Sequence, residues 1–267
     1  MPIRCALKLR PISDAEFNVI DRVVMGCAFA SQNTLGRLCD ERVYENDVAA
    51  RLRAEGFRDV VTQEPIFVTW QEFTKRYRLD LVVNQMVYEF KTVSILVGEH
   101  DAQAIHYGTL LDIDRVKLLN FRSHQVVGKL KRCPILGPAR FQVTTDRSAW
   151  RPLSDRCDWL ANLANDLFRD WGAFLDTQLY EDALMHFCGG EEFCQRRVCV
   201  MRDGIELGTH RLPFHADSTP FVITSFTDEL AVHEHHLQRL LCHTGLPGLQ
   251  WLNFNHCVLQ LKTVVVN

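Results

Sequence analysis

The chain has 267 residues, of which 47% are hydrophobic and 24% are charged, and its formal net charge is −3. This composition is typical of a soluble globular protein and excludes a disordered chain, while the near-neutral charge gives no overall indication of nucleic acid binding. The sequence has no apolar run of about 18 residues and no secretory signal, so we expect a cytoplasmic protein without a membrane partner. Its ten cysteines form no C-x-x-C pair, which indicates free thiols.

Two helices are predicted in the first part of the chain. Ser13 and Glu16 have the spacing of a capping box, and apolar residues follow at helical spacing as far as residue 29. A second helical pattern covers residues 38–55 and ends at Gly56. Glu41 lies on the apolar face of that helix. It is therefore either an acid of a functional site or a surface residue at the edge of the apolar face.

Residues 76–91 predict a β-hairpin whose turn is Asn84 and Gln85. Residues paired across the strands then have numbers that sum to 169, which places two acidic side chains opposite each other. Because side chains alternate along a strand, one face carries four polar residues: Arg78, Asp80, Glu89 and Lys91. Two facing carboxylates suit one hard divalent cation, although the same four residues also suit the solvated face of an antiparallel sheet.

The remaining elements of the first half are two strands and a helix. Residues 59–70 predict a strand that leads into the hairpin, and residues 116–121 predict a buried strand. Between the hairpin and that last strand, residues 99–107 predict a helix on which His100, Gln103 and Tyr107 form a polar stripe. The order of helices and strands indicates an α/β protein.

These residues and their order resemble the GxxExxY proteins, a branch of the PD-(D/E)XK nuclease superfamily. The resemblance covers about residues 15–130 and rests on five short segments: Glu41 to Glu45, Tyr77 to Asp80, Glu89 to Lys91, His100 to Tyr107, and Leu119 to Phe121. The glycine expected three residues before Glu41 is Leu38 in this chain, and Gly36 lies two residues earlier.

The resemblance implies a restriction-endonuclease-like fold, a mixed β-sheet flanked by helices, and a metal-dependent nuclease. It implies that Mg²⁺ or Mn²⁺ binds to Glu41, Asp80 and Glu89, and that Lys91 acts in catalysis with these three acids. The expected substrate is nucleic acid, with DNA as the expected form. Glu45 either joins the site or faces solvent. The residues expected to bind substrate are Arg78, His100, Gln103 and Tyr107.

The second half repeats short segments of the first, which indicates an internal duplication. The matching segments are Tyr44-Glu45 with Tyr180-Glu181 at an offset of 136, His100 and Gln103 with His235 and Gln238 at 135, and Leu119–Phe121 with Leu252–Phe254 at 133. We therefore expect the α/β fold twice, over residues 1–135 and 136–267. The two domains would form an intramolecular pseudo-dimer within one monomer.

The second domain is expected to be a degenerate copy that has lost the catalytic residues. At an offset of 135, the positions of Asp80, Glu89 and Lys91 are taken by His215, Thr224 and Phe226, and at 136 the position of Glu41 is taken by Thr177. A cluster of histidines at residues 233–236 could suggest zinc. It lacks two spaced ligand pairs, so we expect a polar helix instead.

Two readings without catalysis remain beside the nuclease. In one, the chain is a catalytically inactive nuclease-fold scaffold that binds nucleic acid or protein. In the other, it is a partner-binding protein whose second domain supplies the functional surface. The near-neutral first half favours such readings, because proteins that wrap DNA usually carry more positive charge. The intact set of Asp80, Glu89 and Lys91 favours catalysis.

Overall fold

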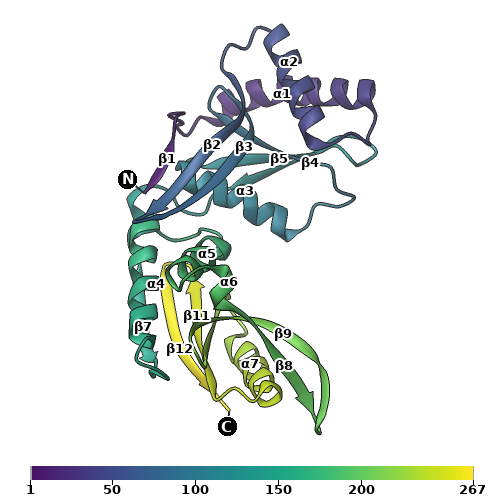
Figure 1. Cartoon of the computed structure of the whole chain (residues 1–267). Coiled ribbons are helices and arrows are strands. Elements are labelled where there is room, and N and C mark those ends of the chain that lie inside the picture. The colour runs from purple at the N-terminus through teal and green to yellow at the C-terminus, as the bar shows by residue number, and fades with distance from the viewer. Residues whose placement is uncertain (1, 267) are drawn as a thin grey trace. The chain divides into compact units, whose positions relative to one another are not determined.

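The structure, a computed structural model, describes residues 2–266 and divides into two compact units (Figure 1). The boundary lies between Ala139 and Arg140. The sequence prediction placed it after residue 135, within the same segment that contains Gly137 and Pro138. Each unit contains a six-stranded mixed sheet with flanking helices. No helix within residues 2–266 is long and apolar enough to cross a membrane.

The first unit contains the predicted elements in the predicted order, together with two strands that were not predicted, Ile3–Cys5 and Val127–Arg132. Its hairpin pairs Leu81 with Tyr88 and Val83 with Met86, so the predicted register is confirmed. The helix predicted to end near residue 29 continues to Leu35. The elements are β1 (Ile3–Cys5), α1 (Asp14–Leu35), α2 (Glu41–Ala54), β2 (Val60–Trp70), β3 (Phe73–Val83), β4 (Met86–Lys91), α3 (Gly98–Leu111), β5 (Arg115–Asn120) and β6 (Val127–Arg132).

The sheet of the first unit has the strand order β1-β2-β3-β4-β5-β6. Neighbouring strands are antiparallel except β4 and β5, which are parallel and are joined through α3. A parallel pair needs such a crossover, because a tight turn can connect only antiparallel strands. Helices α1 and α2 lie on one face of the sheet and α3 lies on the other (Figure 1).

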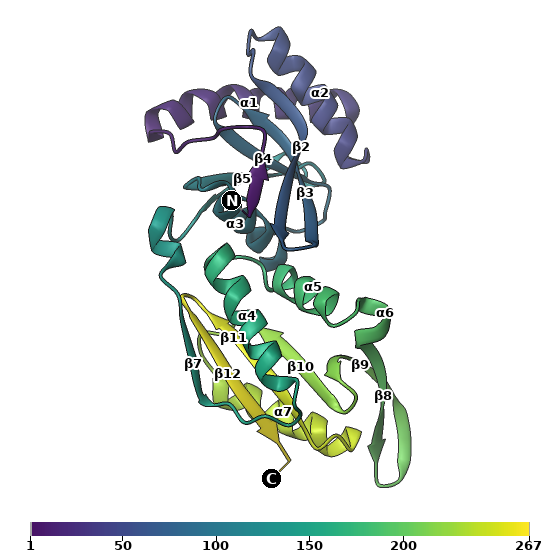
Figure 2. The same cartoon turned by 60° about the vertical axis from the view of Figure 1, so that its left-hand side comes forward.

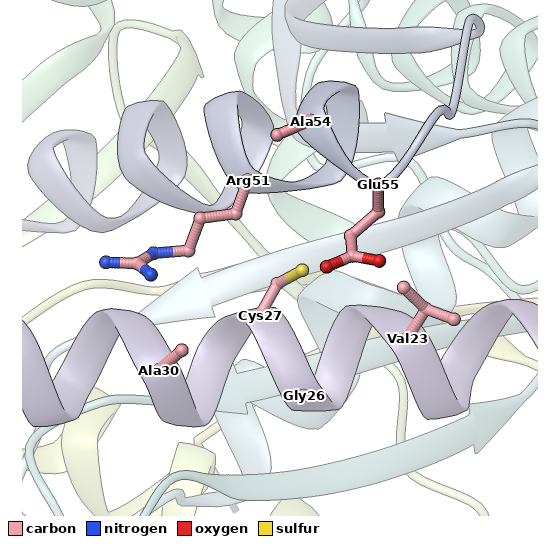
Figure 3. Close-up of a pocket in the computed structure, with 7 residues that line it drawn as sticks. All are labelled: Val23, Gly26, Cys27, Ala30, Arg51, Ala54 and Glu55. Atoms are coloured by element: carbon pink, nitrogen blue, oxygen red, sulfur yellow. The ribbon is translucent and has the colours of Figure 1, made fainter.

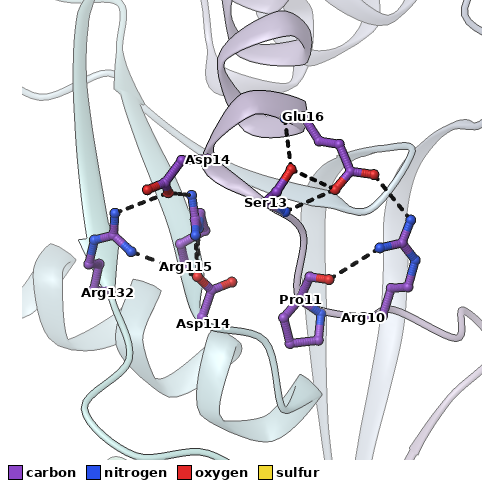
Figure 4. A network of polar contacts seen from close by, with 8 residues as sticks. All are labelled: Arg10, Pro11, Ser13, Asp14, Glu16, Asp114, Arg115 and Arg132. Atoms are coloured by element: carbon purple, nitrogen blue, oxygen red, sulfur yellow. Dashed lines mark hydrogen bonds and ion pairs between the residues drawn. The ribbon is translucent and has the colours of Figure 1, made fainter.

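The start of α1 is fixed by the predicted capping box (Figure 4). Ser13 Oγ accepts a hydrogen bond from Glu16 N at 3.2 Å, and Glu16 Oε2 accepts one from Ser13 N at 2.9 Å. Asp14 adds ion pairs with Arg115 of β5 at 2.6 Å and with Arg132 of β6 at 3.3 Å. Hydrogen bonds from these two arginines hold the pKa of Asp14 below its usual value. Local sequence therefore sets where α1 begins, and the ion pairs tie that end to the sheet.

A buried apolar cluster joins α1 and α2 to the central strands. Val24 of α1 and Val48 of α2 pack in one cluster with Tyr88 and Phe90 of β4. All four side chains are completely buried. Burial of an apolar side chain of this size stabilises the fold by about 1.5–3 kcal/mol. This packing fixes the plane of β4 and so directs the alternate side chains, Glu89 and Lys91, to the other face.

After its first strand, the second unit has the same succession of helices and strands as the first, with one additional short helix, α6, before β8 (Figure 2). Its sheet order is β7-β12-β11-β10-β9-β8, with β10 parallel to β11 and β7 parallel to β12. Its extra strand therefore pairs with the last strand, whereas β1 pairs with β2. The elements are η1 (Gly137–Phe141), β7 (Thr144–Ala149), α4 (Cys157–Trp171), α5 (Thr177–Phe187), α6 (Glu191–Cys194), β8 (Gln195–Arg202), β9 (Ile205–Ala216), β10 (Thr219–Thr224), α7 (Leu230–Thr244), β11 (Gly248–Asn255) and β12 (Val258–Val265).

A tyrosine makes the same contact in each unit. Tyr44 donates its hydroxyl proton to Gly36 O at 2.6 Å, and Tyr180 donates to Gly172 O at 2.6 Å. Both glycines end a helix with positive φ, at 77° and 82°. The ring of Tyr44 also stacks on Phe121, which directly follows β5, with ring centroids 4.4 Å apart. The ring of Tyr180 stacks on Phe254 of β11 with centroids 4.2 Å apart. The same tyrosine contact therefore joins the first two long helices in each unit, α1 to α2 and α4 to α5.

An asparagine closes the same loop in each unit. Asn120 Oδ1 accepts a hydrogen bond from Val93 N at 3.2 Å, and its Nδ2 donates to Val93 O at 2.8 Å. Asn253 makes the same two bonds with Phe226, at 2.8 and 2.9 Å. The residue numbers of both partners differ by 133 between the units. This offset therefore aligns the ends of the central strands.

An ion pair between a helix and the adjacent strand also recurs. In the first unit Asp101 of α3 pairs with Lys129 of β6 at 2.6 Å. In the second unit Glu234 of α7 pairs with Lys262 of β12 at 2.5 Å. Both acid and lysine again differ by 133 in number. Partly exposed pairs contribute little to stability, but the match extends the same alignment to this side of each sheet.

Candidate active site

The predicted hairpin brings Asp80, Glu89 and Lys91 together. Asp80 Oδ2 accepts a hydrogen bond from Phe90 N at 2.8 Å, which fixes this carboxylate beside β4. Glu89 Oε1 accepts a hydrogen bond from Lys91 Nζ at 2.8 Å. Glu89 and Lys91 are nearly buried, with 2% and 9% of their surface exposed. Buried charged side chains of this kind are unlike the solvated face of a sheet, so that alternative is wrong for Glu89 and Lys91, while Asp80 is half-buried.

The pKa values of the two carboxyl groups are both raised, and Asp80 disfavours the charged form of Glu89. Burial, and then the charge of Glu45, raises the pKa of Asp80 to about 6, although the Phe90 N–H lowers it. Burial and the nearby charge of Asp80 raise the pKa of Glu89 well above its usual value. Burial and a nearby negative charge each raise the pKa of a carboxyl group because they disfavour its ionised form. A cation at this point would favour both ionised forms.

Lys91 stays positively charged in this site. Burial alone lowers its pKa, but the charge and hydrogen bond of Glu89 and the charges of Asp80 and Glu41 outweigh burial, so its pKa is raised. The ammonium group satisfies only one oxygen of Glu89. The other oxygen, Oε2, is buried and has no hydrogen-bond donor. An unsatisfied buried carboxylate oxygen costs free energy unless a ligand binds it.

Glu41 lies at the first position of α2 and contacts the segment just after the lysine. Its Oε1 accepts a hydrogen bond from Thr92 N at 2.9 Å. Its charge contributes to the raised pKa of Lys91. The structure therefore places Glu41 at the site, where it contacts the backbone next to Lys91.

A divalent cation fits the donors at the centre of the site. Asp80 and Glu89 present carboxylate oxygens, one of them unsatisfied, and such oxygens are the ligands of Mg²⁺ and Mn²⁺. Within residues 2–266, no three His, Cys, Asp or Glu side chains lie close enough together to form a complete metal site. The protein itself thus offers a pair of ligands, and the expected third ligand, Glu41, is bound to Thr92 in this structure.

Sequence reasoning missed Gln63 and left the role of Glu45 open. Gln63 Nε2 donates to Glu45 Oε2 at 2.9 Å and to Asp80 Oδ1 at 3.2 Å. Glu45 also accepts a hydrogen bond from Arg42 at 2.8 Å and is only 3% exposed, so it faces the site rather than solvent. A signal for Gln63 was available, because a β2–β3 turn at Gln71 would have placed it opposite Asp80.

The other predicted residues make contacts outside the group of Asp80, Glu89 and Lys91. Gln103 Nε2 donates to Tyr107 Oη at 3.0 Å, so the predicted stripe on α3 forms a bonded pair. His100 accepts a hydrogen bond from Val97 N through Nδ1 at 3.0 Å, which caps the start of α3. Arg78 lies on β3 and is exposed, with its backbone paired to Pro65.

The position of Lys91 is occupied by Thr224 in the second unit. β4 pairs Lys91 with Asn120, and β10 pairs Thr224 with Asn253, the asparagine that makes the same loop contacts. The sequence alignment at offset 135 placed Phe226 there, which is wrong by two residues. The offset of 135 came from matching His100 with His235 on the sequence. The ion pairs align α3 with α7 at an offset of 133, which makes His233 the counterpart of His100.

The same shift changes the counterparts of the two acids. With the register of β10, Val222 corresponds to Glu89, so Thr224 is not its counterpart. His215 lies at a β-bulge, between Phe214, which pairs with Pro220, and Ala216, and is buried. It is therefore not the counterpart of Asp80 in a regular pair. Thr177 begins α5 as Glu41 begins α2, so that part of the alignment agrees with the structure.

Two further features contain no predicted site residue. His233 lies between the rings of Phe226 and Trp251, with centroids 4.6 and 5.1 Å away, and no metal-binding group includes it in the described part of the chain. A hollow between α1 and α2 is lined by Cys27, Arg51, Glu55 and small residues of both helices (Figure 3). Burial raises the pKa of the Cys27 thiol, which makes this cysteine a poor nucleophile.

Comparisons with known proteins give one match, to a family model. Searches of curated proteins and of solved structures find no match. Residues 18–133, which contain the hairpin with Asp80, Glu89 and Lys91, match the family model of the PD-(D/E)XK nuclease superfamily.

Proposed function

We propose that the first unit hydrolyses phosphodiester bonds of nucleic acid, with DNA as its substrate, and uses Mg²⁺ or Mn²⁺. The observation that carries the proposal is the unsatisfied, buried oxygen of Glu89 beside Asp80 and Lys91. The match of residues 18–133 to a nuclease superfamily supports the same reaction. Asp80 and Glu89 would hold the cation.

Each residue of the site has a role in this reaction. A bound divalent cation supplies Lewis-acid chemistry and makes a water nucleophilic near neutral pH. Lys91, kept protonated by Glu89, places positive charge where negative charge develops on the phosphate oxygens. Glu41 steadies the backbone that carries Lys91, because it accepts the Thr92 N–H.

The substrate is proposed to lie along β3 and the exposed side of α3. Arg78 is exposed two residues from Asp80, so its guanidinium can contact a phosphate next to the one that reacts. Gln103 and Tyr107 form a bonded pair that can contact the sugar or phosphate. His100 caps α3 and is proposed to act through the position of that helix.

The second unit is proposed to be a degenerate copy of the first that acts as its intramolecular partner in a monomer. The recurring tyrosine, asparagine and ion-pair contacts support a common origin. Val222 and Thr224 lack the carboxylate with which Glu89 would bind a hard cation, so this unit would contribute no cleavage. An experimental structure in which no two-fold axis relates the units would exclude the pseudo-dimer.

The test of the nuclease site is calorimetric titration of Mn²⁺ into the full chain and into Glu89→Ala. Glu72→Ala is the matched control, because it removes an exposed acid in the β2–β3 turn. We expect binding by the wild type and by the control, and loss of binding by Glu89→Ala. Wild-type protein is then incubated with duplex DNA, single-stranded DNA and RNA. No binding at millimolar Mn²⁺, with or without DNA, would favour the inactive scaffold.

A further inference from the structure

Gln63 has an unusual backbone conformation for its place in the fold. It lies within β2, between Thr62, which pairs with Leu81, and Glu64, which pairs with Leu79. Asp80 is therefore its neighbour across the strands. The φ angle of Gln63 is 58°, and among residues 2–266 it is the one non-glycine residue with positive φ inside a strand rather than at a turn, loop or helix end. Such strain persists where the surrounding contacts compensate for it.

The side chain of Gln63 connects two acids. Its Nε2 carries two protons, and it donates to Glu45 Oε2 at 2.9 Å and to Asp80 Oδ1 at 3.2 Å. Glu45 belongs to α2 and Asp80 to β3, so one amide joins the helix to the catalytic strand. Hydrogen bonds to ionised carboxylates are stronger than those between neutral groups, which compensates for the strained backbone.

Asp80 is held at both oxygens as a result. Phe90 N donates to Oδ2, and Gln63 donates to Oδ1. A carboxylate with both oxygens bound cannot rotate freely, so its remaining lone pairs keep one direction. Outer contacts of this kind orient metal ligands and tune metal affinity.

We propose that Gln63 is a positioning residue that orients Asp80 for the cation, and that its left-handed backbone is required to direct the amide between Asp80 and Glu45. The proposal rests on the proposed metal-dependent site. Gln63 acts through Asp80 and need not contact the substrate.

The test uses Gln63→Gly, which removes the amide and also relieves the strain. Glycine adopts positive φ without a steric penalty, and this gain offsets the loss of the two hydrogen bonds, so the variant should unfold at about the same temperature as wild type. Its Mn²⁺ affinity should nevertheless fall by about 10–100-fold, the range seen when outer contacts of metal ligands are removed. A residue with a purely structural role would lose stability together with affinity.

Gln71→Gly is the matched control. Gln71 also has positive φ, at 48°, but lies in the turn between β2 and β3. We expect it to bind Mn²⁺ as wild type does. If wild type binds Mn²⁺ and Gln63→Gly binds within twofold of it, the positioning role is wrong and the proposed nuclease site remains. If wild type itself binds no Mn²⁺, the proposed site fails and the positioning role fails with it.

Discussion

The two units share a backbone plan but differ at the end of one central strand. β4 ends with Glu89 and Lys91, and β10 has Val222 and Thr224 at the same register. The contacts that hold the plan together, such as Tyr44 to Gly36 and Tyr180 to Gly172, are present in both. The residues that hold the fold are therefore different from those of the proposed site, and the fold remains where the proposed site residues are replaced.

A second difference lies inside the units. In the first, Asp21 of α1 pairs with Lys117 of β5 at 2.5 Å and accepts a hydrogen bond from Tyr88 at 3.4 Å. In the second, the corresponding contact is neutral, with Gln250 donating to Cys157 at 3.2 Å. Phe221 pairs with Gln250 as Tyr88 pairs with Lys117, so the hydroxyl is absent as well.

This second difference shows that the charged groups change as a set. Removing only one member of a buried ion pair leaves an uncompensated charge, whereas a complete neutral set has no such cost. The charged set of the first unit and the neutral set of the second therefore each leave no buried charge unpaired at the same place in the fold.

The largest expected effect distinguishes Lys91, at the end of β4, from Thr224, at the end of β10. Lys91→Ala should lower cleavage by about 10²–10³-fold, because positive charge is lost where phosphate charge develops. Thr224→Ala should leave cleavage unchanged. Single-turnover cleavage of a labelled duplex measures both, and circular dichroism shows whether each variant is folded. Equal cleavage by Lys91→Ala and wild type would contradict the site.

The next effect concerns the charged set in the first unit. Asp21→Cys should destabilise that unit by about 3 kcal/mol, because Lys117 would remain buried without its partner. The double variant with Lys117→Gln, which copies the second unit, should recover much of this loss. Urea unfolding of the two single variants and the double variant forms a double-mutant cycle. Additive losses would show that the two sets are not equivalent.

The pH dependence of stability should come partly from His215. Burial, and then the charge of Arg156, lowers the pKa of His215 to about 4. The unfolded state, with a pKa near 6.5, binds the proton more readily, so stability falls as pH falls from about 6.5 towards 4. Between pH 8 and pH 5 this group should cost about 2 kcal/mol. Urea unfolding at both pH values should show a smaller loss for His215→Phe, and an unchanged loss would contradict the assignment.

The smallest effect tests whether the two tyrosine contacts are equivalent. Tyr44→Phe and Tyr180→Phe each remove one hydrogen bond to a glycine carbonyl and keep the stacked ring. Each should lower the free energy of unfolding by about 1 kcal/mol. Urea unfolding measures both. A loss in one unit and none in the other would mean that the contact does not hold both units in the same way.

Local patterns gave reliable predictions where neighbours in sequence make the structure. Ser13 and Glu16 are three residues apart, so the start of α1 could be predicted from their spacing. The turn at Asn84 and Gln85 fixed the register that places Asp80 near Glu89. In both cases the interacting groups are close in sequence, and backbone geometry leaves few alternatives.

The alignment of the second unit was less accurate for a physical reason. The offset between the units is 136 at the helix ends, Gly36 and Gly172, and 133 at Asn120 and Asn253. Loops of different length lie between these points. Short matches cannot locate such changes, so the predicted counterparts of Glu89 and Lys91 were displaced by two residues.

The sequence by itself determined the hairpin, its register and the shared face of Asp80, Glu89 and Lys91, because the turn and the alternation of side chains depend on only a few neighbouring residues. Only the tertiary structure placed Gln63 between Glu45 and Asp80, and only it bound Glu41 to Thr92. These contacts join elements that are 17 to 51 residues apart. They form because the packing of α2 on the sheet brings those side chains together, and no local pattern encodes that packing.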